Sequence, residues 1–103
     1  MSKKPLKKLS CDDKLKAIKN NNGFQYDAMK AVEELTELSA AIMQALTKRN
    51  KDAHKDIIEE FGDVDFRLGV LRNYFDSKAI AKRKRFKINK SIGYLKTQKY
   101  GKI

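Results

Sequence analysis

The chain has 103 residues and a formal net charge of +11, with one cysteine, one histidine and one proline. This length fits one domain or one protomer of an assembly, and no apolar run approaches the roughly 20 residues of a membrane-spanning helix. A single cysteine, Cys11, excludes a disulfide framework and fits a reducing cytoplasm. One Cys and one His also argue against a zinc site with nitrogen and sulfur ligands.

The charges divide the chain into a central body and two basic ends. Residues 1–10 contain four Lys, residues 78–103 contain ten Lys or Arg, and neither segment contains an acid. Residues 11–77 contain ten basic residues and all thirteen acids, which gives this body a net charge of −3. Three interpretations of the basic ends stay open: nonspecific binding of nucleic-acid phosphate, neutralisation of a polyanionic substrate, and solubility.

The first predicted elements are a flexible basic N-terminus over residues 1–10 and one helical domain over 11–103. Asn and Gly at positions 20–23 predict a turn, because both tolerate left-handed backbone. A helix is predicted from Gln25 to Thr47, where apolar residues alternate four and three apart. These residues are Ala31, Leu35, Leu38, Ile42 and Ala45. Asp52 is the predicted N-cap of the next helix.

The second predicted helix, Ala53 to Asp76, has the clearest apolar pattern. One line of apolar residues alternates four and three apart, and a second line runs along a different side. The first line is Ile57, Phe61, Val64, Leu68, Leu71 and Phe75, and the second is Phe66, Val70 and Tyr74. Gly62 and Gly69 each cost about 1 kcal/mol of helix propensity, so we expect them to allow close helix packing. Two apolar sides need two partners, and we infer a homo-oligomer that completes the bundle.

The third predicted helix covers residues 78–100 and is basic. Its apolar residues are only partly periodic, and Ser91 and Gly93 interrupt them. No part of the sequence alternates Val, Ile and Thr as a strand would. The predicted fold is therefore all-α, a bundle of about three to four helices per protomer that oligomerisation completes.

Two acidic edges lie on the first two of these helices. Glu34 and Glu37 are three residues apart, as are Glu60 and Asp63, so each pair shares one helix face. If the two helices pack antiparallel, four carboxylates converge beside the apolar stripes. Such a cluster raises the pKa of its members unless a cation neutralises it, and Mg²⁺ or Mn²⁺ prefers carboxylate oxygens.

Like charges at helical spacing add weight to this interpretation. Glu33 with Glu37, Asp56 with Glu60 and Glu59 with Asp63 are each four residues apart, and each pair costs a few tenths of a kcal/mol. A surface selected only for stability would place Lys or Arg at these positions. The alternative interpretation is a solvated acidic face without a metal.

The motif Glu33-Glu34-x-x-Glu37, followed by Glu60-x-x-Asp63, resembles the EExxE…ExxD signature of the MazG-like, all-α nucleoside triphosphate pyrophosphohydrolases. These enzymes are related to the dimeric dUTPases and dCTP pyrophosphatases. The resemblance covers both central helices, about half of the chain. It implies a homodimer or homotetramer that cleaves a (d)NTP to (d)NMP and pyrophosphate, with a role in nucleotide-pool house-cleaning.

The same resemblance assigns roles to the acids. Glu34, Glu37, Glu60 and Asp63 would be ligands of Mg²⁺, with Mn²⁺ as the alternative ion. Glu33 would orient or deprotonate the attacking water, or it would instead hold a ligand in place through a hydrogen bond.

Recognition of the substrate needs basic groups for the phosphates and a surface for the base. The basic helix offers Lys84, Lys87, Asn89 and Lys90 for the phosphates, and a solvated basic tail is the competing interpretation. Phe24 and Gln25, at the start of the first long helix, are candidates for base stacking and base reading, although a core position for Phe24 is the favoured interpretation.

The leading interpretation is therefore a cytoplasmic Mg²⁺-dependent pyrophosphohydrolase. The alternative is a noncatalytic, small basic helical protein that binds nucleic acid through its ends, and a third is an oligomerising or regulatory protein. The short length and basic ends suit a phage protein that acts in the host cytoplasm. The preferred base and sugar, and the choice between a (d)NTP and an alarmone, stay open.

Overall fold

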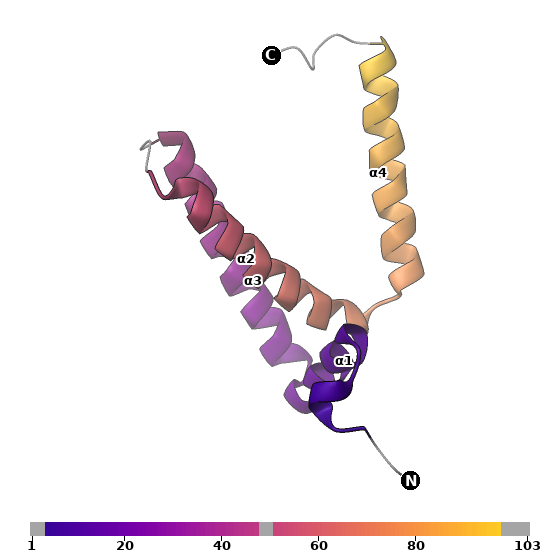
Figure 1. The fold of residues 1–103 in the computed structure, drawn as a ribbon. Helices are drawn as coiled ribbons and strands as arrows, with labels where there is room; N and C mark the ends of the chain where they lie inside the picture. Colours follow the sequence, from indigo (N-terminus) through magenta and orange to yellow (C-terminus); the bar gives the residue numbers. More distant parts are fainter. Residues whose placement is uncertain (1–3, 48–50, 98–103) are drawn as a thin grey trace.

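A computed structural model describes residues 4–47 and 51–97 of the chain. Within these ranges all regular structure is helical, which confirms the all-α prediction (Figure 1). The elements in chain order are the 3₁₀ turn η1 (Leu6–Lys8), α1 (Cys11–Asn22), α2 (Phe24–Thr47), α3 (Ala53–Leu71), the 3₁₀ turn η2 (Arg72–Tyr74) and α4 (Ser77–Thr97).

The helices α2 and α3 form a long antiparallel hairpin, and they run side by side over most of their length (Figure 1). Small side chains line the contact between them: Ala31 and Ala41 of α2 are buried, and so is Val64 of α3. Small residues let the two backbones approach closely, and the acids beside them therefore face each other across a narrow gap.

The helix α1 is an element that the sequence reading did not predict. Ser10 caps it, because the Ser10 hydroxyl oxygen accepts a hydrogen bond from the backbone N–H of Asp13 at 3.1 Å. Asp12 and Asp13 lie in its first turn, where the helix dipole favours negative charge. The helix ends at Asn22, and Gly23 follows it with a φ of 88°, which requires the freedom of glycine. The turn predicted at residues 20–23 is confined to Gly23, because residues 20–22 are the last residues of α1.

A buried carboxylate joins α1, α2 and η2. Asp27 is 1% exposed. Its oxygens accept hydrogen bonds from the Asn22 side-chain amide at 2.9 Å and from the Tyr74 hydroxyl at 2.8 Å. The Tyr74 hydroxyl also lies 3.1 Å from the carbonyl oxygen of Lys19. Because both oxygens of Asp27 have partners, the charge is tolerated inside this small fold.

The end of the second predicted helix is wrong by several residues. The helix was expected to reach Asp76, but α3 ends at Leu71 and η2 follows it. Asp76 instead begins the next element, because its carboxylate accepts hydrogen bonds from the backbone N–H groups of Lys78 and Ala79 at 2.9 and 3.3 Å. A capping acid favours a new helix start over the continuation of the old helix.

The apolar lines predicted for α3 are only partly buried within one protomer. Val64 and Val70 are buried, whereas Phe61 and Phe66 are 52% and 40% exposed. Gly69 confirms close packing, since a Cβ atom there would lie 3.0 Å from a methyl carbon of Leu15 on α1. Gly62 does not, because a Cβ atom there would meet nothing within 4 Å.

The helix α4 stands away from the hairpin (Figure 1). Among its residues 77–95, Ile80 alone is half-buried and the others are exposed. The helix was predicted to reach residue 100; it is described to Thr97, and positions 98–100 lie outside the described residues. No helix in the described ranges is both long enough and apolar enough to cross a membrane.

Candidate metal centre

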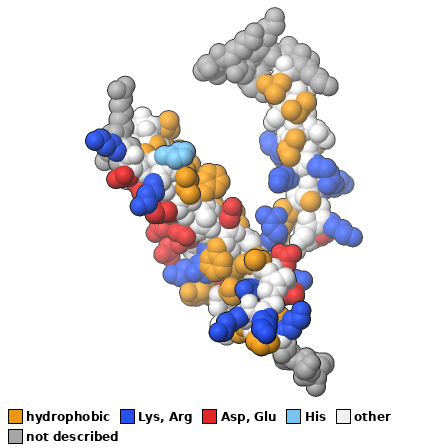
Figure 2. Space-filling model, in the orientation of Figure 1, with side chains coloured by type: hydrophobic (Ala, Val, Ile, Leu, Met, Phe, Trp, Pro, Cys, Tyr) orange, Lys and Arg blue, Asp and Glu red, His pale blue; other side chains and the backbone are white. Residues whose placement is uncertain are grey.

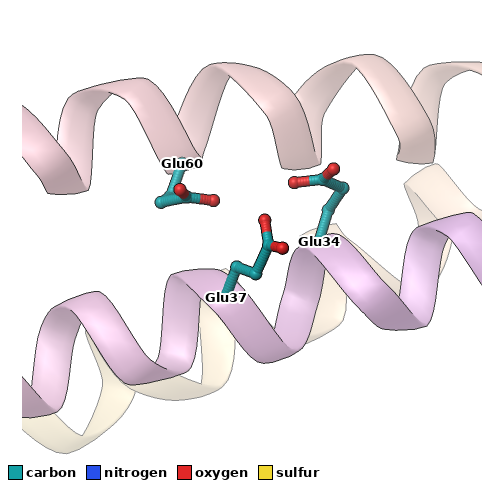
Figure 3. A group of neighbouring side chains, drawn as sticks. All are labelled: Glu34, Glu37 and Glu60. Atoms are coloured by element: carbon teal, nitrogen blue, oxygen red, sulfur yellow. The ribbon is translucent and has the colours of Figure 1, made fainter.

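Three of the predicted ligands converge between α2 and α3. Glu34 and Glu37 extend from α2 and Glu60 extends from α3, and their carboxylates point into the same gap (Figure 3). One carboxylate oxygen from each residue lies within 4.8 Å of the others. The spacing of three residues on α2 and the antiparallel packing with α3 together produce this cluster. The sequence predicted four converging carboxylates, and three of them converge here.

Two oxygens of this cluster have no hydrogen-bond partner. Oε2 of Glu34 and Oε2 of Glu60 are buried, and neither accepts a hydrogen bond in the described part of the chain. An unpartnered buried carboxylate oxygen costs free energy. All of the donor atoms are carboxylate oxygens, the set that hard cations such as Mg²⁺ and Mn²⁺ prefer, so the residues present fit such an ion.

The environment of Glu34 disfavours its negative charge. Burial raises the pKa of the Glu34 carboxyl above its ordinary value, and a hydrogen bond with Glu37 and the charges of Glu37, Asp63 and Glu33 raise it further. A cation bound between these groups would favour the charged form of Glu34 and would lower its pKa.

An acidic groove of about 250 Å³ extends from the cluster toward the α2–α3 turn. Glu37 and Glu60 line it together with Asp56, Glu59, Gln44 and two alanines. Acids therefore gather along the middle of the hairpin, whereas Lys and Arg predominate on α4 (Figure 2). Asp56 and Glu59 were recognised in the sequence only as members of like-charge pairs; their place in this groove depends on how the two helices face each other.

The other two predicted acids lie beside the cluster. Asp63 is exposed and is not one of the three converging residues, although its charge acts on Glu34. Glu33 is exposed as well, and its carboxylate forms an ion pair with Lys30 at 3.3 Å. Within one protomer, the Glu33 carboxylate therefore contacts Lys30 and is not part of the cluster at which an attacking water was expected.

Within one protomer, the predicted phosphate-binding residues lie away from the acidic cluster. Lys84, Lys87, Asn89 and Lys90 are all exposed on α4. This helix diverges from the hairpin that carries Glu34, Glu37 and Glu60 (Figure 1). The sequence could not reveal this separation, because the direction of α4 is set at the short connection around Phe75 and Asp76.

The two residues predicted to contact the base lie at the far end of α2. Phe24 is 50% exposed, and its ring packs edge-to-face against Tyr74 and Phe75, with centroid distances of 5.3 and 6.0 Å. Gln25 is exposed. Phe24 precedes Glu34 by ten residues, about 15 Å along a helix. The favoured interpretation, a core position for Phe24, is therefore wrong: its ring contacts Tyr74 and Phe75, but half of the side chain is exposed.

Comparisons with known proteins give no family assignment. No protein-family model, no curated protein and no solved structure matches the chain.

Proposed function

We propose that the chain is a Mg²⁺-dependent nucleoside triphosphate pyrophosphohydrolase that acts in the cytoplasm, converting a (d)NTP to a (d)NMP and pyrophosphate. The observation that carries the proposal is the convergence of Glu34, Glu37 and Glu60, whose ligand oxygens lie within 4.8 Å of one another. The buried, unpartnered oxygens of Glu34 and Glu60 support it, because a cation would supply the missing partner.

In this proposal the three glutamates hold the ion, and Asp63 completes the set when its side chain turns toward Glu34. When bound, Mg²⁺ neutralises phosphate charge and lowers the pKa of a coordinated water. Glu33 has a carboxylate one residue from the cluster, and release from Lys30 would free it to accept a proton from water. The acidic groove beside the cluster repels a triphosphate, so cations from elsewhere are needed.

We propose that a second copy of the chain supplies those cations. The helix α4 carries Lys84, Lys87 and Lys90 and is not packed on its own hairpin. Several apolar residues of α4 are about half exposed, namely Phe86, Ile88, Ile92, Tyr94 and Leu95. Apolar surface of this extent favours a helical partner. A homodimer or homotetramer would cover it and bring basic side chains to the acids of another copy.

The test is pyrophosphate release from a panel of nucleotides with Mg²⁺. The proposal predicts turnover of at least one nucleotide, its loss on adding EDTA, and a fall of about 100-fold or more for Glu37→Gln and Glu60→Gln. Asp65→Asn is the matched control, because Asp65 is an exposed acid of α3 outside the cluster. No turnover on any nucleotide, or equal loss in the control, would contradict the proposal.

The exposed basic face of α4 favours a second candidate function, binding of nucleic acid without catalysis. Seven Lys or Arg lie between residues 78 and 90, all are exposed, and no acid interrupts them. If this function holds, affinity for DNA or RNA falls steeply with salt. Such binding without nucleotide turnover would favour the second candidate over the first.

A further inference from the structure

A cavity separate from the acidic cluster is lined by residues of α1, α3, η2 and the start of α4. Its volume is about 370 Å³, within the range of small-molecule sites. It is lined by Asp12, Leu15, Lys16, Gly69, Arg72, Asn73 and Ser77. Gly69 lies nine residues after Glu60, about two and a half helical turns, so the cavity and the cluster lie on opposite sides of α3.

Packing and hydrogen bonds hold two of the lining residues, Leu15 and Asn73, in place. Leu15 approaches Gly69 so closely that a Cβ atom at Gly69 would lie 3.0 Å from the Leu15 methyl carbon. The side-chain amide of Asn73 donates to the carbonyl oxygens of Gly69 and Val70, at 3.1 and 3.4 Å. These bonds fix the Asn73 amide and leave its Oδ1 atom available as an acceptor.

The charged side chains that line the cavity are available to a ligand. Lys16 and Arg72 form no ion pair or hydrogen bond through their side chains with any residue in the described ranges, and neither does Asp12. Two cations against one acid give the lining a net positive charge. The guanidinium of Arg72 and the ammonium of Lys16 suit a phosphate group. Asp12, Ser77 and Oδ1 of Asn73 suit hydroxyl groups.

We propose that this cavity binds a small phosphate monoester that carries hydroxyl groups, such as a sugar phosphate. Lys16 and Arg72 hold the phosphate, and Asp12, Asn73 and Ser77 accept hydrogen bonds from the hydroxyls. The proposal does not depend on the acidic cluster, because none of the residues that line the cavity belongs to that cluster.

The test is an amide NMR titration of the full chain with two probes, ribose 5-phosphate and inorganic phosphate. The proposal predicts saturable shifts at Leu15, Lys16, Gly69 and Asn73, with tighter binding of the ester than of the free ion. Lys16→Ala and Arg72→Ala each weaken ester binding by about tenfold or more. Lys14→Ala is the matched control, since it removes the same charge from α1 and does not line the cavity.

Two outcomes would overturn the proposal. One is the absence of saturable shifts at these residues for both probes, and the other is equal weakening by Lys14→Ala, which would mark nonspecific attraction to cations. Equal affinity for the two probes would overturn the assignment of the hydroxyl-binding residues. Arg72→Lys keeps the positive charge in η2 and serves as a second variant in case Arg72→Ala does not fold. Its affinity for the ester is expected to lie between those of the wild type and Arg72→Ala.

Discussion

At the scale of single residues, the hydrogen bond between Asp27 and Tyr74 stabilises the junction of α1, α2 and η2. Tyr74 Oη donates to Asp27 at 2.8 Å, and Asn22 donates to the other carboxylate oxygen at 2.9 Å. Asp27 is 1% exposed, so water cannot replace a lost donor without opening the structure. The stability of the junction between α1, α2 and η2 therefore depends on this pair.

Tyr74→Phe is expected to destabilise the protein by about 1–3 kcal/mol, because it removes a donor from a buried carboxylate. Urea unfolding followed by circular dichroism measures this change. Tyr26→Phe is the matched control, since Tyr26 is 48% exposed, and it should leave the free energy of unfolding almost unchanged. Equal effects of the two substitutions would argue against a special role of the Asp27–Tyr74 hydrogen bond.

The raised pKa of Tyr74 predicts that the fold loses stability at high pH. Burial, the hydrogen bond to Asp27 and the Asp27 charge raise the pKa of Tyr74 to about 12, from an ordinary value of 10.0. A folded-state pKa above the unfolded value stabilises the fold below pH 10, and this stabilisation disappears as the pH rises from about 10 to about 12. Unfolding measured between pH 9 and 12 should show this loss in the wild type but not in Tyr74→Phe.

Sequence reasoning predicted part of the residue-level picture. Glu34, Glu37 and Glu60 were predictable because spacing on a helix decides which side chains share a face. The burial of Asp27 was not, because its partner Tyr74 lies 47 residues away in the chain. The cavity residues Lys16 and Arg72 were missed for the same reason, since α1 and η2 meet only in the folded chain.

At the scale of elements, the two glycines of α3 differ in their surroundings. They are seven residues apart and lie on nearly the same helix face. A Cβ atom at Gly62 meets nothing within 4 Å, whereas one at Gly69 lies 3.0 Å from Leu15. The apolar pattern predicted a helix here, although it placed the end at Asp76 and not at Leu71. It could not distinguish these glycines, because α1 itself was not predicted.

Gly62→Ala is expected to stabilise the protein by about 0.5–1 kcal/mol, because alanine has the better helix propensity and the space is open. Gly69→Ala should gain less or lose stability, because Leu15 must move away. Thermal or urea unfolding of the two variants under identical conditions tests the difference. A larger gain at Gly69 than at Gly62 would contradict the close contact between α1 and α3.

At the scale of the whole molecule, one protomer buries little apolar surface. Its radius of gyration is 17.9 Å, compared with about 13 Å for a compact domain of this length. The buried apolar side chains in the described ranges are only Ala31, Ala41, Val64 and Val70. Sequence reasoning predicted three helices and unpartnered apolar faces, but which copy covers which face depends on contacts that one chain does not contain.

We therefore expect the purified protein to be an oligomer, and Ile92→Asp to shift it toward the monomer. Ile92 is 47% exposed on α4, and a charge there would be buried at the proposed interface. Light scattering during size-exclusion chromatography measures the mass. Ala79→Asp adds the same charge at an exposed position of α4 on a different side of the helix from Ile92 and is the control. A monomeric wild type at micromolar concentration would contradict the proposed assembly.

The central claim is that Glu34, Glu37 and Glu60 hold one divalent cation between α2 and α3. A Mn²⁺ titration followed by paramagnetic broadening of amide NMR signals tests it most directly. The claim predicts that signals around these three residues broaden first, at substoichiometric Mn²⁺, and that Glu37→Gln abolishes this selectivity whereas Asp65→Asn does not. Broadening spread evenly over all exposed acids, or first at Asp12 and Asp13, would contradict it.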